Sequence, residues 1–344
     1  MIRRALVLGG GGARGSFQVG MLEHLVGTLG LDFQIIRGVS VGALNASYLA
    51  QASTAGDSLG NLLQQVKQLS MLWTERIQGN YSVYQGRPGS YAGLVAGADS
   101  LYSLKPLRGL IETDLDPNRL RYSGRDFAVG YTSLVTGDYA EANASDPSFI
   151  ERLVASASIP VVFPFVDLKQ DVLVDGGVRN ITPLASAFRA KPDEIYVLMT
   201  SRAVFANNQV PPNTVLPNTY EQWDDNWLGT KINGFDVLER TLDVVLDEVY
   251  LEDIRSAIDC NEIVGAIEAA RSAATGNAEV QAALDRVAQT RSLARKRYVK
   301  LFVLAPQQWY GDKNSSTEFS PTLISQAIAH GRQVAADPTL WLTR

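Results

Sequence analysis

Two kinds of apolar pattern alternate along this chain. Short apolar runs have the length of buried strands, whereas longer stretches carry apolar residues at helical spacing. This alternation favours an α/β protein. Strands are predicted at 4–8, 33–36, 172–174, 194–199 and 298–304, and helices at 16–29, 41–52, 147–156 and 235–258.

The middle of the chain also predicts a β-hairpin, formed by 126–135 and 139–143 around Thr136-Gly137-Asp138. The length of 344 residues alone would suggest about two domains. However, the candidate functional residues described below are spread from Gly10 to Asp175, and the pieces of one site cannot be assigned to separate modules. We therefore expect one large α/β domain with helical insertions.

Ser40 lies in a Gly-x-Ser-x-Gly motif, Gly38 to Gly42, between a predicted strand and a predicted helix. A serine in a sharp strand-to-helix turn has its hydroxyl lifted clear of the backbone, and the flanking glycines leave room for the turn and an ester. The helix that follows places its positive N-terminal end beside any negative charge formed there. This context predicts the nucleophile of a serine acyl hydrolase.

A glycine-rich loop, Gly9 to Gly15, joins the first strand to the first helix and contains Gly-x-Gly-x-x-Gly at Gly10, Gly12 and Gly15. A dinucleotide site is disfavoured because no acidic residue ends the second strand, and a P-loop is disfavoured because no Gly-Lys-Ser/Thr follows. What remains is a loop whose bare N–H groups point at an anion. An oxyanion hole has this form.

Asp175 ends the short apolar strand Val172-Leu173-Val174 and precedes Gly176 and Gly177. An active-site residue at the carboxyl end of a strand has this layout. Taken alone, Asp-Gly-Gly is also an ordinary turn signal. Asp175 is the better candidate for a general base, because the chain contains only two histidines and both have structural interpretations.

The two histidines are His24 and His330. His24 falls on the solvent-facing side of the helix predicted at 16–29. Gly331 directly follows His330 and suggests a helix end, where a histidine complements the C-terminal dipole.

Composition excludes several classes of protein. The apolar stretch after Met1 ends at Gly9 and is too short for a signal peptide, and no window approaches the roughly 20 apolar residues of a membrane span. The single Cys260 suits a reducing interior, and a net charge of −5 gives no general attraction to nucleic acid or anionic membranes. We expect a cytoplasmic protein without nucleic-acid partners, peripheral to membranes at most.

The three motifs together resemble the patatin-like phospholipase family of the bacterial type. Their order and strand context carry the resemblance, which extends over about residues 4–200. The matching segments are Gly10 to Gly15 with Arg14 before the last glycine, Gly38 to Gly42, Ala155 to Pro160, Phe163-Pro164, Asp175 to Gly177 and Val178 to Pro183.

The resemblance implies a patatin-like three-layer α/β fold, with a central mostly parallel sheet flanked by helices plus helical insertions. It implies a single catalytic domain over 1–344 with its core motifs within 4–200, a loop and helical insertion at 205–297, and a closing strand and C-terminal helix at 298–344.

The resemblance also implies the chemistry of a lipid acyl hydrolase. Ser40 and Asp175 would form a catalytic dyad without histidine, metal or cofactor, acting on phospholipids or lysophospholipids with transient contact to a membrane surface. The resemblance implies further site residues beside the dyad. They are Gly10, Gly11, Gly12, Arg14 and Gly15 in the glycine-rich loop, which would form the oxyanion hole, Gly38 and Gly42 in the turn around Ser40 (the nucleophile elbow), and Gly176 and Gly177 after Asp175.

Two alternatives stay open. Ser40, Asp175 and His330 follow the chain order of an α/β-hydrolase triad, although the elbow comes early and His330 lies in a predicted helix. A catalytically silent lipid-binding or regulatory protein could share the same fold. Segments 78–104 and 204–230 resist assignment; both suit lids or binding loops, and packing over the core is the ordinary alternative.

Overall fold

The computed structural model describes residues 2–87, 97, 99–205, 208, 234–290, 293, 296–308 and 316–344. Side chains are described at all of these except 234–240, 242–248 and 290. Most of the segment 204–230, including Trp223 and Trp227, lies outside the described residues, so its interpretation as a lid stays a prediction.

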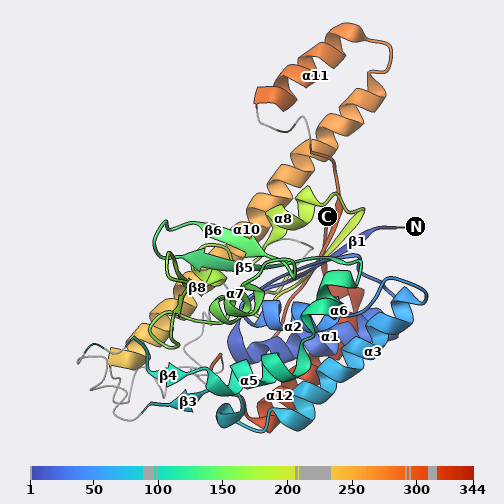
Figure 1. Cartoon of the computed structure of the whole chain (residues 1–344). Helices are drawn as coiled ribbons and strands as arrows, with labels where there is room; N and C mark the ends of the chain where they lie inside the picture. The colour runs from blue at the N-terminus through green and yellow to red at the C-terminus, as the bar shows by residue number, and fades with distance from the viewer. Residues whose placement is uncertain are drawn as a thin grey trace.

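A mixed sheet forms the centre of the molecule (Figure 1). Its described strands run in the order β11–β10–β9–β1–β2–β5–β8–β7, with β6 paired to β5. The five central strands are parallel, and the outer ones pair antiparallel. The parallel strands are β1 (Arg4–Leu8), β2 (Ile35–Val39), β5 (Asp126–Ser133), β9 (Glu194–Leu198) and β10 (Lys300–Leu304); the others are β6 (Tyr139–Ala142), β7 (Val166–Asp167), β8 (Val172–Asp175) and β11 (Leu342–Thr343).

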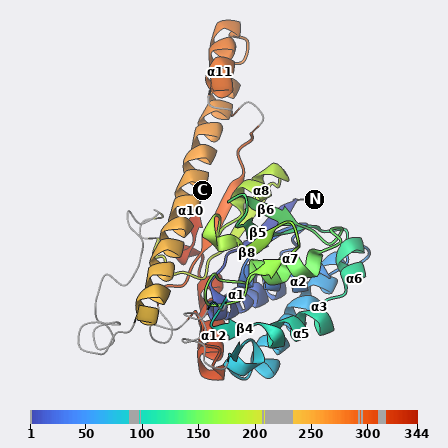
Figure 2. The same ribbon diagram turned by 60° about the vertical axis from the view of Figure 1, so that its left-hand side comes forward.

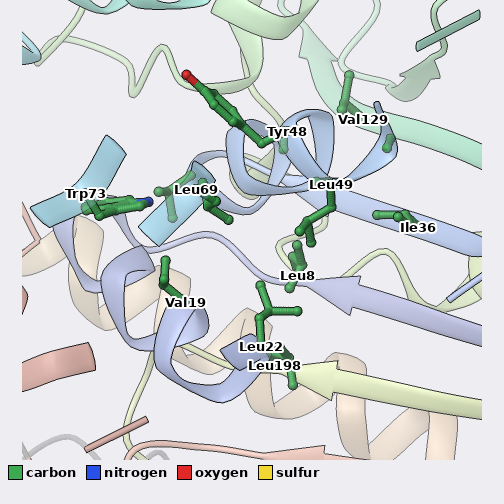
Figure 3. Close-up of a cluster of buried hydrophobic side chains, with 14 of the residues drawn as sticks. Leu8, Val19, Leu22, Ile36, Tyr48, Leu49, Leu69, Trp73, Val129 and Leu198 are labelled. Carbon is green, nitrogen blue, oxygen red and sulfur yellow. The ribbon is translucent and has the colours of Figure 1, made fainter. Parts of the chain in front are cut away.

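The alternation of side chains along the strands creates a core on each face of the sheet. In β1, Leu6 and Leu8 face one core, while Ala5 and Val7 face the other. Figure 3 shows part of the larger core, where Leu8, Leu22 and Leu198 meet beneath Leu49. Helices therefore cover both faces, as the α/β pattern predicts.

The larger core is covered by helices from several parts of the chain, and the smaller core by two of the helices that the structure describes (Figures 1 and 2). The helices on the larger core are α1 (Gly15–Gly27), α2 (Val41–Ala50), α3 (Ser58–Met71), α5 (Lys105–Asp114), α6 (Pro117–Tyr122), α7 (Phe149–Ser156) and α12 (Pro321–Ala336). On the smaller core lie α8 (Leu184–Arg189) and part of α10 (Gly234–Ala273). A two-stranded ribbon, β3 (Gln85–Gly86) and β4 (Tyr102–Ser103), lies apart from the sheet.

The prediction that Gly331 ends a helix is wrong, because α12 continues to Ala336. A Cβ at Gly331 would lie 2.2 Å from the Phe17 carbonyl oxygen, and one at Gly20 would lie 1.9 Å from the Ile328 carbonyl oxygen. The two glycines therefore allow α1 and α12 to cross at backbone contact. Gly331 is needed for close helix packing and not for a helix end.

Helix α10 is longer than the predicted 235–258 and extends beyond the body of the molecule with α11 (Ala278–Thr290) (Figures 1 and 2). A small separate core, formed by Val264, Ile267, Ala288 and Leu293, holds this projection together. The extra turns of α10 thus have their own packing partners.

Candidate active site

Ser40 occupies the turn between β2 and α2, as the motif predicts. Its backbone has φ 56° and ψ −131°, a conformation that is costly for a residue with a Cβ. A Cβ at Gly38 would lie 2.3 Å from the Gly42 carbonyl oxygen, and one at Gly42 would lie 2.1 Å from the Leu8 carbonyl oxygen. Both glycines are thus required by close backbone packing. The Ser40 N–H donates to Ser156 Oγ at 2.9 Å, which helps to hold the strained turn.

Asp175 ends β8 and is 4% exposed. Its N–H donates to the Ser158 carbonyl at 3.0 Å, and its Oδ1 accepts from the Gly177 N–H at 2.8 Å. The strand that carries Asp175 pairs antiparallel with β5, and Asp175 lies opposite Tyr131, one residue beyond the Gly130 that pairs with Val39. Asp175 therefore lies level with Ser40 at the carboxyl edge of the parallel strands, although its own strand runs in the opposite direction. Gly176 is required because a Cβ there would lie 2.6 Å from the Gly130 carbonyl oxygen.

Burial raises the pKa of the Asp175 carboxyl from 3.8 to about 7, opposed by its hydrogen-bonding interactions with the Ser40 side chain and the Gly177 N–H. The Ser40 interaction is loose, because Asp175 Oδ2 has no partner with full hydrogen-bond geometry among the described residues. Such contacts often tighten only when a substrate binds. The structure therefore brings together the serine and the carboxylate that the motifs single out.

The glycine loop lies directly against Ser40. A Cβ at Gly10 would lie 2.9 Å from the Ser40 Cβ. Gly11 and Gly12 have φ values of 143° and 57°, and within the described part of the chain neither N–H has an acceptor in hydrogen-bond range. The helix α2 also begins at Val41 with unsatisfied backbone N–H groups, as every helix does. The site thus presents N–H donors from two elements beside one hydroxyl.

The rest of this loop fixes its position. Gly15 begins α1, and a Cβ there would lie 2.3 Å from Val41 Cγ2, so the residue allows α1 to approach α2. The Ala13 N–H donates to the Ser316 carbonyl at 2.8 Å. Arg14 is only 7% exposed, so it is not a solvated surface charge.

Two residues that sequence reasoning missed support the loop from the far side, and a third holds Thr182, the neighbour of the Ile181 carbonyl that accepts from the Gly10 N–H. The hydroxyls of Thr200 and Tyr250 both donate to the Gly10 carbonyl. Asp253 accepts from the Thr182 N–H at 3.3 Å, and burial raises its pKa to about 7. Tyr250 and Asp253 are three residues apart on α10, but this spacing belongs to no motif, and only the fold shows what they contact.

A buried polar chain continues from the loop into the core. The Gln18 amide donates to the Gly9 carbonyl at 2.9 Å and accepts from Asn45 Nδ2 at 2.9 Å. The Asn45 oxygen accepts in turn from Trp73 Nε1 at 3.0 Å. Because buried side-chain polar groups are costly unless paired, this chain fixes α1, α2 and the segment after α3 in one arrangement.

An apolar cavity opens beside Ser40. Its walls come from the glycine loop, α2, the π-helical turn 72–76 and α5. Val83 and Leu104 of the unassigned segment 78–104 contribute to it, so part of that segment packs over the core as well as lining the cavity. The lining residues are Gly12, Ser40, Val41, Leu44, Asn45, Tyr48, Leu72, Trp73, Ile77, Val83, Leu104, Leu107, Leu110, Ile111, Ala157, Ile159, Phe163, Ser316 and Phe319.

Within the described part of the chain, Ser40 and Asp175 interact with each other and form hydrogen bonds with Ser156, Ser158 and Gly177, and with neither histidine. His24 is half-buried in α1, where its carbonyl accepts from the Thr28 N–H. His330 is buried inside α12, its Nε2 accepts from the Gln307 N–H at 3.1 Å, and its ring lies 5.5 Å from that of Phe17. Burial lowers the pKa of His330. This environment favours a neutral, structural imidazole.

The described residues contain no group of three or more His, Cys, Asp or Glu side chains placed to hold a metal ion. None of the described helices is long and apolar enough to cross a membrane. Cys260 is free and half-buried in α10.

Comparison with known proteins places these observations in a family. The chain aligns over its full length with 68% of the crystal structure of VipD from Legionella pneumophila, at 12% identity and a TM-score of 0.42. A search of curated proteins finds no match. The family model for patatin-like phospholipases matches residues 6–188, a stretch that contains the glycine loop, the Ser40 turn and Asp175. The chain therefore belongs to the patatin-like phospholipase family.

Proposed function

We propose that this protein is a serine acyl-ester hydrolase of the phospholipase A or lysophospholipase type, with Ser40 as nucleophile and Asp175 as general base. The observation that carries the proposal is the strained Ser40 turn at an apolar cavity, beside a buried carboxylate whose pKa is raised to about 7. A strained turn, a desolvated charge and a cavity all cost stability, and they coincide at the reacting group that such an enzyme needs.

The first half of the reaction forms an acyl-enzyme. Asp175 takes the hydroxyl proton of Ser40 as Oγ attacks the ester carbonyl, and it returns that proton to the leaving alcohol. An aspartate with the ordinary pKa of about 3.9 is a weak base for this step. Burial raises the pKa of Asp175 to about 7, which brings the base close to neutral pH.

Negative charge develops on the carbonyl oxygen during this attack. The N–H groups of Gly11, Gly12 and Val41 are the donors that support an oxyanion hole, because they lie beside Ser40 at the loop and at the start of α2. In the second half, water attacks the acyl carbonyl as Asp175 takes a proton from it, and Asp175 returns that proton to Ser40 Oγ as the bond between Oγ and the acyl group breaks and the fatty acid leaves.

The cavity supports an acyl chain as the recognised part of the substrate. Its lining is almost entirely apolar, and two of its polar members, Asn45 and Tyr48, already make hydrogen bonds within the protein. Burial of an apolar chain in the cavity stabilises the complex by about 0.8 kcal/mol for each methylene. The polar head group of a lipid would remain outside the cavity.

The substrate test compares three classes of acyl ester. Lysophospholipids and short nitrophenyl esters should be hydrolysed with higher kcat/KM than diacyl phospholipids in intact vesicles, because a monoacyl substrate needs no extraction from a bilayer. Steady-state kinetics on a lysophospholipid, a dispersed diacyl phospholipid and a nitrophenyl ester measure this order. Absence of turnover with all three would contradict the hydrolase, and a strong preference for vesicles rich in anionic lipid would contradict the substrate class.

The raised pKa of Asp175 predicts the pH dependence of the enzyme. Below about pH 7 the base is protonated, so kcat/KM should fall about tenfold per pH unit. A profile that stays flat from about pH 7 to pH 5 would contradict the assigned base.

Stability should change with pH in the opposite direction. The folded-state pKa of Asp175 is raised above 3.8, so its stabilising contribution is fully present below about pH 4 and is lost as the pH rises through about 7. The full effect is about 4 kcal/mol, since one pKa unit corresponds to about 1.4 kcal/mol. Asp175→Asn should therefore stabilise the protein more at about pH 8.5 than at about pH 5, as measured by chemical denaturation.

A further inference from the structure

The cavity beside Ser40 follows one face of α2. Ser40 precedes the helix, Leu44 lies one turn further, and Tyr48 lies two turns further, and all three line the cavity. At the Ser40 end the lining includes Gly12 and Ser316, which are both partly exposed. We therefore regard the Ser40 end as the mouth and the Tyr48 end as the floor.

Polar contacts close the floor. The Tyr48 hydroxyl donates to the Asp114 carboxylate at the end of α5, and Arg76 forms an ion pair with the same carboxylate. Figure 3 shows Tyr48 leaving α2 on the side away from Leu22 and Leu198. Tyr48 is 8% exposed, whereas the Arg76 side chain is 44% exposed, so the phenol ring separates the cavity from solvent.

A second set of contacts makes this closure rigid. Gln51, one turn after Tyr48, donates from its amide nitrogen to the Asp114 carbonyl at 3.3 Å. Its amide oxygen accepts from the Asp116 N–H at 2.9 Å. The C-terminal ends of α2 and α5 are thus joined by one contact between side chains and by two contacts from the Gln51 side chain to backbone groups. Tyr48 cannot rotate away without breaking its hydrogen bond to Asp114.

We propose that the Tyr48–Asp114–Arg76 cluster is the floor of the acyl pocket and sets the length of the acyl chain that the enzyme accepts. The proposal rests on the proposed hydrolase function. The eight residue-to-residue steps from Ser40 to Tyr48 span about 12 Å of helix. A fully extended acyl chain advances roughly 1.3 Å along its axis per carbon–carbon bond of about 1.5 Å. A pocket about 12 Å long therefore holds about nine or ten carbons.

The test is a series of nitrophenyl esters from C2 to C16, measured as kcat/KM with the intact protein. The wild-type protein should prefer about C8 to C10. Tyr48→Ala removes the floor and should move the optimum to longer chains, raising the C16-to-C8 ratio of kcat/KM at least tenfold. Leu44→Trp fills the pocket midway and should move the optimum to about C4, so the second variant tests the proposal even where Tyr48→Ala fails to fold.

Tyr48→Phe and Tyr122→Ala are the matched controls. Tyr48→Phe keeps the ring but loses the hydrogen bond to Asp114, so its C16-to-C8 ratio should lie between those of the wild type and Tyr48→Ala. Tyr122 lies in α6 with 76% of its surface exposed, and its replacement should leave the profile unchanged.

The outcomes separate this proposal from the proposed function. If the wild type, Tyr48→Ala and Leu44→Trp hydrolyse the esters with the same chain-length profile, the proposed role of the Tyr48 cluster is contradicted. The proposed hydrolase function is then unaffected. If none of the proteins hydrolyses any ester, and alkyl fluorophosphonates from C4 to C16 leave every one unlabelled, the hydrolase itself is wrong. Alkyl fluorophosphonates should otherwise label the three proteins with the same shifts in length preference as the esters.

Discussion

Ser40→Ala should lower kcat for a simple ester by about 10⁴- to 10⁶-fold, and Asp175→Asn should lower it nearly as much. The alanine removes the atom that becomes acylated. The asparagine keeps the size of the side chain but cannot accept the serine proton. Because Oδ1 of Asp175 accepts from the Gly177 N–H, the amide oxygen of asparagine can keep that contact, and the fold should survive.

The double variant tests whether the two residues act as one unit. The double variant Ser40→Ala/Asp175→Asn should have a kcat only slightly lower than that of either single variant, because each single change already removes the same reaction path. His24→Ala and His330→Ala should remain active, because the carboxyl of Asp175 interacts with Ser40 and Gly177 and the His330 ring with Gln307 and Phe17. A folded His330 variant as inactive as Ser40→Ala would replace the dyad with a triad.

Changes in the glycine loop should have the next largest effect. Gly12→Val places a side chain at φ 57°, where its Cβ would lie 1.9 Å from the Ser316 carbonyl oxygen. The loop must move, and its N–H groups lose their alignment with the oxyanion. Loss of one such donor costs about 10²- to 10³-fold in kcat. We expect a loss of this size at least, measured with a short nitrophenyl ester on protein whose circular dichroism is unchanged.

A gentler substitution and a matched control sharpen this test. A Cβ at Gly10 would lie 2.9 Å from the Ser40 Cβ, so Gly10→Ala should displace the nucleophile and lower kcat by about 10²-fold. Gly137 also has a positive φ, 76°, but nothing lies within 4 Å of its Cβ position in the turn between β5 and β6. Gly137→Ala should therefore lower stability without lowering kcat. Normal kinetics in folded Gly12→Val would remove the loop from the active site.

The sequence predicted the parts of this fold whose signals are local. The apolar runs marked β1, β2, β9 and β10, and the glycines around Ser40 marked the turn that the structure contains. The hairpin of β5 and β6 was also confirmed, because its turn chemistry lies between two apolar runs.

The remaining features depend on contacts between distant segments. The direction of β8 follows from its pairing with β5, which no residue within β8 encodes. Gly331 was mistaken for a helix end, because its partner in close packing, Phe17, lies in a different helix. Tyr250 supports Gly10 from 240 residues away, and the floor of the cavity joins residues of α2, α5 and the π-helical turn. Such partners are visible only once the chain is folded.

Fluorophosphonate labelling tests the central claim most directly, because the probe reacts with an activated serine and does not react with a passive pocket. The wild-type protein should gain one phosphonyl group, and mass spectrometry of peptides should place it on Ser40. Ser40→Ala should not be labelled, and Asp175→Asn should be labelled far more slowly. An unmodified Ser40 in folded wild-type protein, or a label on another serine, would contradict the account.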